Sequence, residues 1–357
     1  MGLPNIDIEF KQLATSAIAR STRGRVALIV HDDTDKSFST VTYSLTTDIE
    51  STKFTAANVQ YITDCFVGVP LSVTVIRIDV EGVIADALTI AGTLDWDWIG
   101  IAEGQQADQT ALASWIKAQE VLKKTYKAVV YNPTTAPDCK HVVSFTNSNV
   151  TFSDARGQVT GENYVATLLG IFAGIALDKS TTYFVCTNLS SVTEVADNNA
   201  AIDAGKLVLI NDSGEVRIGA GVNSLTTLDT NNTADMQQVV IVESMDLMLT
   251  DIRTTFKESY IGQYKNKLDN QILFISAVNS YFESLADEDV LDSDYDNMVS
   301  VDVDEQRKAW LAVGKTEVSG WSDTQVTNNT FKNQVFLAAN VKILGAVEDL
   351  QLNITMA

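Results

Sequence analysis

The stretch from Gly24 to about Asn132 alternates apolar runs with helix-forming segments, and this alternation constrains the fold more than any other feature. RVALIVHDD and STVTYSLTT are predicted as a hairpin, and LSVTVIRI, WDWIGIA and KAVVYN as further strands. Helices are predicted at TAANVQYITDCF, around Ile84 and from Gln105 to Lys124. Strands that alternate with helices in this way indicate an α/β fold, and we expect one here.

The rest of the chain shows two further patterns. Residues 133–232 predict a hairpin at HVVSFTNSNVTF, a helix at ENYVATLLGIFAGIAL, a helix end at Gly205 and a hairpin turned by DSG. After Thr233 two long helices are expected. The first has an apolar face at steps of three and four, formed by Ile241, Met245, Met248, Ile252, Phe256, Tyr260 and Tyr264. A third helix is predicted after Asp302, because Asp302 and Glu305 have capping-box spacing, and a strand follows at NQVFLAANVKILG.

These changes of pattern predict how the chain divides. A chain of 357 residues is long for one hydrophobic core, so we expect a multidomain protein of mixed α/β and α+β character. The expected parts are an N-terminal arm and linker (1–23), an α/β region (24–232, with possible subdomains 24–132 and 133–232), a C-terminal domain (233–345) and a C-terminal arm (346–357).

Both ends of the chain carry an amphipathic strand with no partner next to it in the sequence. Within NIDIEF and EDLQLNITM every second residue is apolar: Ile6, Ile8 and Phe10 in the first, and Leu350, Leu352, Ile354 and Met356 in the second. Such strands either join the chain's own sheet or pair with neighbouring molecules.

Composition excludes several classes of partner. A net charge of -21 and a pI near 4.3 argue against binding to nucleic acid or to an anionic membrane surface. Neither a membrane-length apolar run nor the residue order of a signal peptide is present, so we expect a cytosolic protein. Cys65, Cys139 and Cys186 are odd in number and far apart, which predicts buried reduced thiols rather than disulfides or a metal site.

Motifs for catalysis are weak. His31 and His141 are the only histidines, and no G-x-S-x-G motif accompanies them. The GKT at residues 314–316 does not form a phosphate loop, because Ala309 stands where the loop needs glycine and a helix precedes it. No G-x-G-x-x-G follows a strand. We therefore expect no catalytic residues and no cofactor, while an enzyme would need a ligand pocket at Asp32 or Asp33.

Two other motifs have alternative interpretations. Asp292, Asp294 and Asp296 have the spacing of the first calcium-loop ligands, but Val303 replaces the glutamate needed at position twelve. We expect a solvated acidic loop and no metal there. Trp96 and Trp98 lie on one side of a predicted strand, where core packing is favoured over a sugar site.

Four segments, taken in their order along the chain, carry a resemblance to a known family: RVALIVHDDT, AAIDAGKLVLINDSGEVRIGAGVNSLTT, TADMQQVVIVESMDLMLTDIRTTF and VFLAANVKILGAVEDLQLNITM. In this order of features the chain resembles the contractile-tail sheath proteins, which polymerise around the tube of contractile phages, phage-tail-like bacteriocins and related injection systems. The resemblance covers most of the chain and is strongest to the short sheaths of defective prophages and of R-type, diffocin-like bacteriocins. It departs from relatives with a Trp-Gly-Ala-Arg-Thr-like motif, because this chain has IGAGVNSLTT there, so a role of that arginine does not transfer.

The resemblance implies a structural subunit rather than an enzyme. Residues 24–232 would form an outer region, residues 233–345 with the N-terminal strand an inner domain facing the tube, and both arms would add strands to a small sheet of neighbouring subunits. The implied partners are further copies in a helical polymer, with hexameric rings, together with the tail tube, baseplate and tail-terminator proteins, but neither nucleic acid nor membrane. Assembly would occur in the bacterial cytoplasm, followed by release as a phage tail or bacteriocin particle. The alternatives are a cytosolic α/β enzyme and a surface-layer or adhesion protein.

Two sets of residues are candidates for sheath-specific roles. Arg253, Lys257 and Lys265 are spaced to share one helix stripe, with Lys267 beside it, so they form either a solvated basic face or a salt-sensitive clamp on an acidic tube. Gly24 and Gly345 lie where the arms join their domains. They act either as hinges during contraction or as fixed turns.

Gly345→Pro tests the hinge, because proline restricts φ and removes a backbone donor. We expect the variant to assemble extended sheaths that contract slowly or not at all in mild denaturant. Electron microscopy would measure the fraction of short, wide sheaths, and contraction at the wild-type frequency would place the hinge elsewhere.

Overall fold

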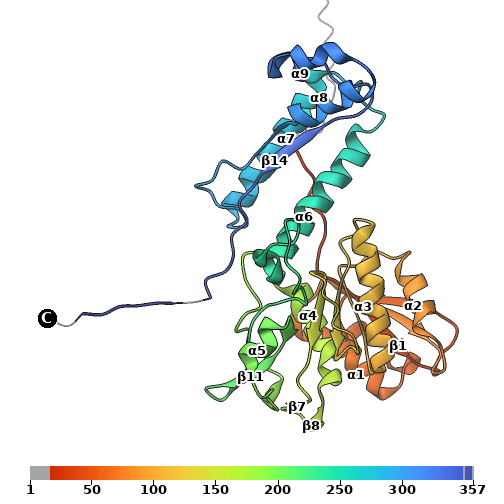
Figure 1. Cartoon of the computed structure of the whole chain (residues 1–357). Helices are drawn as coiled ribbons and strands as arrows, with labels where there is room; N and C mark the ends of the chain where they lie inside the picture. The colour runs from red at the N-terminus through yellow and green to blue at the C-terminus, as the bar shows by residue number, and fades with distance from the viewer. Residues whose placement is uncertain (1–16, 349, 356–357) are drawn as a thin grey trace, which may run out of the picture. The chain divides into compact units, whose positions relative to one another are not determined.

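The structure is a computed structural model that describes residues 17–348 and 350–355 (Figure 1). It contains two compact units, each described here by itself: an α/β unit of residues 22–246 with those from 345 onward, and a helical unit of residues up to 21 with 247–344. The chain thus passes between the units after residues 21, 246 and 344. The boundaries expected at residues 24, 233 and 346 separate the outer region, the inner domain and the arms of an assembled sheath, and they remain predictions. Four arm residues lie outside the described residues: Ile6, Ile8, Phe10 and Met356.

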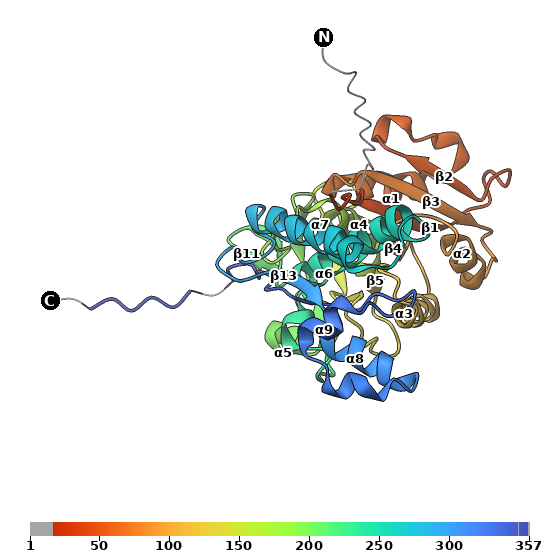
Figure 2. The ribbon, with the colours of Figure 1, turned by 90° about the horizontal axis from the view of Figure 1, so that it is seen from above.

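A seven-stranded sheet forms the centre of the α/β unit, in the order β10-β6-β5-β4-β1-β3-β2. Figure 2 shows part of this order, from β2 through β3, β1 and β4 to β5. Pairing is parallel except between β2 and β3. β1 is an almost continuous apolar run because parallel strands are covered on both faces. The strands are β1 (Arg25–His31), β2 (Thr40–Tyr43), β3 (Ser72–Ile78), β4 (Trp98–Ile101), β5 (Lys127–Tyr131), β6 (Val142–Phe145) and β10 (Lys206–Leu207).

Helices cover both faces of this sheet, and all four match the predicted positions. α1 (Ala56–Cys65) and α4 (Val165–Gly174) share one hydrophobic core with the sheet, while α2 (Ile84–Ala91) and α3 (Gln106–Val121) share another. Trp98 belongs to the first core and Trp96 to the second. Both tryptophans are therefore core residues as predicted, but the prediction that they share one side was wrong.

Two predicted hairpins were wrong, because the strands expected to pair are not neighbours in a sheet. β3 separates β1 from β2, which is a half-exposed edge strand. β6 pairs with β5, whereas β7 (Asn149–Phe152) belongs to a separate sheet with β8 (Gln158–Thr160) and β9 (Leu189–Val192). Between β6 and β7 the buried Asn147 accepts the Leu209 N–H at 2.7 Å and donates to the carbonyls of Thr193 and Leu209. Its side chain thereby directs the chain from one sheet to the other.

The hairpin predicted at DSG is confirmed, between β11 (Leu209–Asp212) and β12 (Glu215–Ile218). Ser213 and Gly214 have φ values of 53° and 88°, as a type I′ turn requires. Gly205, with φ of 69°, follows helix α5 (Asn198–Asp203), as predicted for a helix end.

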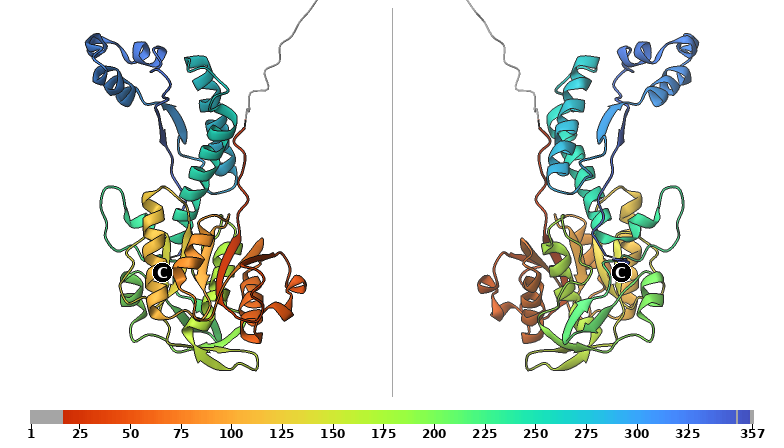
Figure 3. Two further views of the ribbon diagram at one scale, coloured as in Figure 1. Left: turned by 90° about the vertical axis from the view of Figure 1, so that its right-hand side faces the viewer. Right: turned by 90° about the vertical axis from the view of Figure 1, so that its left-hand side faces the viewer.

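The helical unit contains the predicted helices and a two-stranded antiparallel sheet, seen as blue arrows in Figure 3. The Asp302 side chain accepts the Glu305 N–H at 2.9 Å and so caps α8 as predicted. The apolar face predicted to continue to Tyr264 was wrong in its last part, because α6 gives way to a π-helical turn at Phe256–Tyr260 (η6). The elements are α6 (Val239–Thr255, shared with the α/β unit), α7 (Leu268–Asp287), β13 (Met298–Val301), α8 (Val303–Ala312), α9 (Asp323–Asn328) and β14 (Leu337–Asn340).

Glycine in α4 allows the backbone of this helix to contact the backbone at the end of α1 directly. A Cβ atom at Gly170 would lie 1.8 Å from the Cys65 carbonyl oxygen. We expect Gly170→Ala to destabilise the α/β unit by about 3 kcal/mol, at the upper end for overpacking, because backbone atoms must move. Gly320→Ala is the control, since nothing lies within 4 Å of its Cβ position. Denaturant unfolding measures both variants, and equal stability would contradict the close contact.

Candidate functional site

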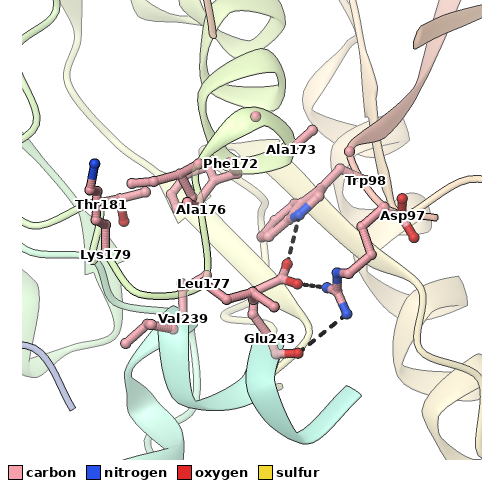
Figure 4. Close-up of a pocket in the computed structure, with 15 residues that line it drawn as sticks. Asp97, Trp98, Phe172, Ala173, Ala176, Leu177, Lys179, Thr181, Val239 and Glu243 are labelled. Carbon is pink, nitrogen blue, oxygen red and sulfur yellow. Dashed lines mark hydrogen bonds and ion pairs between the residues drawn. The ribbon is translucent and has the colours of Figure 1, made fainter. Parts of the chain in front are cut away.

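The first half of helix α6 carries two buried carboxylates into the α/β unit. Glu243 accepts a hydrogen bond from Trp98 Nε1 at 2.8 Å and forms ion pairs with Arg23 and with Lys127 Nζ, the latter at 3.4 Å. Figure 4 shows Glu243 between Trp98 and the guanidinium group with which it forms the ion pair, that of Arg23. Glu243 and Phe172 line a cavity of about 260 Å³. These contacts join the start of α6 to β4 and β5.

Asp246, one turn further along α6, completes the buried charge cluster. It lies 3.1 Å from Lys127 Nζ and 3.1 Å from His141 Nε2. Burial alone would raise the pKa of Asp246, but these two cations outweigh burial and lower the pKa to about 2. Burial would lower the pKa of His141, yet its interactions with Asp246, Cys139 and Glu120 raise it to about 11. The His141 ring thus lies buried between two carboxylates.

The residues proposed for an enzyme occupy a different part of the α/β unit. The Asp32 carboxylate is buried and accepts hydrogen bonds from the backbone N–H groups of Thr34 and Thr55 and from Asn58 Nδ2. These bonds outweigh burial and lower its pKa to about 2. Asp32 thereby orders the loop after β1. His31 lines a nearby cavity of about 620 Å³, but Asp32 is held by its own loop.

The four basic residues of the predicted stripe do not share one helix. Arg253 lies on α6 and Lys257 on the π-helical turn, whereas Lys265 and Lys267 lie in the loop before α7. The Lys267 ammonium is 3.0 Å from Asp269. The prediction of a single stripe was therefore wrong, because α6 ends at Thr255. Their contact with a tube remains a prediction.

The hinge candidates lie near the points where the chain passes between units. Gly24 has φ of 88°, its carbonyl accepts the Leu71 N–H at 2.7 Å, and a Cβ would meet the Ala173 oxygen at 3.1 Å. This close packing favours a fixed turn at Gly24. Gly345 is exposed, and a Cβ there would approach only Gln238 Oε1, at 3.2 Å.

The described part of the C-terminal arm has no regular secondary structure between residues 350 and 355. Its apolar side chains are largely exposed: Leu350 at 87%, Leu352 at 68% and Ile354 at 77%. The arm begins at an anchored point, because the Glu348 carboxylate accepts hydrogen bonds from Ser180 Oγ at 3.2 Å and Thr182 Oγ1 at 2.7 Å. Three apolar side chains thus alternate along a segment that does not bury them.

An apolar groove of about 490 Å³ lies in the helical unit, and we call it the β14 groove. β14 and its flanking residues form one wall with every second side chain, and the second half of α6, the π-helical turn and α7 form the other. Sequence analysis did not find this groove, because its residues are separated by up to 93 positions. The alternation in NQVFLAANV was the one sequence signal for it. The lining residues are Met248, Leu249, Ile252, Arg253, Phe256, Phe274, Phe282, Val335, Leu337, Ala339 and Val341.

Comparison with known proteins gives one consistent result. The family model of the phage tail sheath C-terminal domain matches residues 231–357. The tail sheath protein of Clostridium phage phiCD119 is 31% identical over 366 aligned residues, which cover 99% of each chain. Identity at this level over the full length establishes a common family.

Solved structures share the fold at lower identity. The helical sheath of the anti-feeding prophage in its contracted state has a TM-score of 0.74 at 12% identity and covers 99% of both chains. The contracted PVC sheath, from an extracellular contractile injection system, has a TM-score of 0.70 at 12% identity, covering 99% of this chain and 98% of that one. The sheath tail protein of Desulfitobacterium hafniense has a TM-score of 0.70 at 15% identity, covering 84% and 94%.

The mixed helix-and-sheet architecture is the one shared with the sheath proteins of contractile systems. The chain belongs to the tail sheath protein family, as the resemblance predicted. This membership does not favour the enzyme or the surface-layer alternative. Among the described residues, no helix has the length and apolarity needed to span a membrane.

The buried charge cluster generates a prediction about stability. Asp246→Asn leaves Lys127 and His141 buried without their shared counter-ion, so we expect a loss of about 3–5 kcal/mol in the free energy of unfolding. Asp212→Asn, at a half-exposed ion pair of 3.5 Å with Arg217, should cost about 0–1 kcal/mol.

The same cluster predicts a pH dependence. The lowered pKa of Asp246 stabilises the fold above about pH 4, and this contribution disappears as the pH falls towards 2. Denaturant unfolding between pH 7 and pH 2 should therefore show the wild type approaching Asp246→Asn in stability at low pH. A constant difference between the two proteins would contradict the assignment.

Proposed function

We propose that this chain is the subunit of a sheath that polymerises helically around a tail tube and contracts to drive the tube through a target cell envelope. One observation carries the proposal: the C-terminal arm exposes Leu350, Leu352 and Ile354 on alternate positions, as a strand awaiting a partner would. Addition of an extended segment to an open sheet edge is a known binding mode. The arm of one subunit would bind a second copy in this way.

The small sheet of the helical unit is the proposed acceptor. In the part of the chain that the structure describes, β13 and β14 pair only with each other as strands, and a two-stranded sheet is marginal by itself. Leu337 and Ala339 of β14 face the β14 groove. An added strand would extend the hydrogen-bonded ladder, while its apolar side chains would enter this groove. Ile6, Ile8 and Phe10 of the N-terminal arm would bind a neighbour in the same manner.

The energies explain why more than one arm is needed. Burial of Leu350, Leu352 and Ile354 would contribute about 5–9 kcal/mol. Ordering six backbone residues costs about 6–12 kcal/mol. One arm is thus close to break-even before its hydrogen bonds are counted. Two arms from each subunit make the second contact effectively intramolecular and convert marginal contacts into a stable lattice.

The remaining partners are part of the same proposal. Solved relatives include a helical sheath and a baseplate of the anti-feeding prophage, which supports self-assembly and a baseplate contact for this chain. We propose from the resemblance hexameric rings, contacts with a tail tube and a tail terminator, and assembly in the bacterial cytoplasm. Arg253, Lys257, Lys265 and Lys267 are all exposed and stay the candidates for contact with the tube.

Contraction needs no catalytic group in this proposal. Subunits would move as rigid bodies between a metastable extended packing and a contracted packing of lower free energy. The segment that connects the C-terminal arm to its unit must then bend while the arm stays bound to the neighbouring subunit. Gly345 follows the last point at which the chain passes between units, while Glu348 holds the start of the arm, which supports Gly345 as the flexible residue.

Ile354→Asp tests the arm, because it places a charge on the apolar side of the proposed strand. We expect a folded, soluble subunit that forms at least about ten-fold less polymer by sedimentation and electron microscopy. Asn353→Asp is the matched control, since it adds the same charge to the polar side and should assemble normally. Equal assembly of both variants would overturn the arm's role.

A second pair of variants examines the acceptor in the same assay. Ala339→Glu introduces a charge into the β14 groove, whereas Ala338→Glu introduces it at the neighbouring position, outside the groove lining. Both residues are exposed in the single chain, so both variants should fold. Selective loss of assembly in Ala339→Glu supports the groove as the acceptor, and normal assembly excludes it.

A further inference from the structure

Three side chains that can bind metals converge in the α/β unit. They are Glu120 at the end of α3, and Cys139 and His141 just before β6. Glu120 Oε2 lies 3.1 Å from Cys139 Sγ and 3.1 Å from His141 Nδ1. One ligand atom from each residue falls within 4.8 Å of the other two.

A second, independent observation is the state of the His141 ring. His141 is more than nine-tenths buried, and its Nδ1 atom points at Glu120 Oε2, 3.1 Å away, in a geometry that does not make a well-formed hydrogen bond. The opposite nitrogen, Nε2, is held by Asp246 at 3.1 Å. Lys140 Nζ binds the other Glu120 oxygen, Oε1, at 3.0 Å, which leaves Oε2 directed at the cluster.

This arrangement has the chemistry of a zinc site. Thiolate, imidazole and carboxylate together suit Zn²⁺, with bonds of about 2.0–2.3 Å that hold ligand atoms about 3–4 Å apart. A carboxylate on the far nitrogen of a metal-bound histidine is the usual outer partner that fixes the ring. We propose that Glu120, Cys139 and His141 bind a zinc ion, and that Asp246 positions His141 for it.

The charge balance supports a dication at this buried place. One thiolate, one carboxylate and a neutral imidazole form a neutral unit with Zn²⁺, so no net charge is buried. The competing state is the protonated one, in which His141 bridges Glu120 and Asp246 through hydrogen bonds. The two states differ in what they require of Cys139: zinc needs its thiolate, whereas the protonated network needs only its thiol.

The site would join the end of α3 to the start of β6. It would lie next to the first half of α6, which carries Asp246. Zinc would therefore stabilise the folded α/β unit in proportion to its affinity and concentration. A fourth position is left for water.

Metal analysis of the full-length chain tests the proposal. After treatment with a chelator and dialysis against micromolar Zn²⁺ at pH 8, we expect one zinc per chain by mass spectrometry, and a thiolate-to-metal absorption band when Co²⁺ is used. Cys139→Ser should lose stoichiometric zinc and the band. Glu120→Gln, at a half-exposed residue that should not disturb folding, should weaken zinc binding at least about ten-fold.

The other thiols and the other histidine provide matched controls. Cys65→Ser and Cys186→Ser remove equally buried thiols, and His31→Asn removes the second histidine, so all three should retain zinc. Zinc should also raise the melting temperature of the wild type but not that of Cys139→Ser. Less than about one tenth of a zinc per chain in the wild type, or equal loss in Cys65→Ser and Cys139→Ser, would overturn the site and leave the protonated network.

Discussion

Lys127 on strand β5 and the carboxylates of Glu243 and Asp246 on α6 form the ion pairs on which the remaining structure depends. Helix α6 is one of three places where the chain leaves the α/β unit, and these pairs hold its first half against the sheet. A buried ion pair contributes little net stability, because desolvation opposes the attraction, but removal of one partner is costly. Such a contact therefore fixes where α6 starts and in which register.

The C-terminal arm shows the opposite physical situation. Its backbone is unpaired between residues 350 and 355, and its apolar side chains face solvent. The free energy of binding one arm is close to zero before hydrogen bonds, so separate subunits can remain soluble until several contacts form together. An arm of this kind would suit the proposed polymer, which assembles through several weak contacts and later rearranges. The proposed zinc site would strengthen the rigid body without altering the arms.

Much of the fold was predictable from local pattern. The apolar run of β1, the helix cap at Asp302 and the turn at Ser213 and Gly214 each depend on neighbours in the sequence, and each was predicted correctly. The two wrong hairpins have different causes: β3 lies between β1 and β2, whereas β6 and β7 belong to different sheets. The prediction of one basic stripe was wrong for another reason. The π-helical turn after Thr255 changes the direction in which successive side chains point, and it has no clear sequence signal.

By itself the sequence determined the type of most elements, the apolar side of the arm and, through resemblance, the family, because these depend on residue identity and spacing along the chain. Only the tertiary structure decided which strands are neighbours, that His141 lies between Asp246 and Glu120, and that β14 borders an apolar groove. Each of these joins residues tens to a hundred positions apart. Loop closure over such lengths changes free energy only slightly, so packing of the whole core, rather than any local pattern, selects among the possible partners.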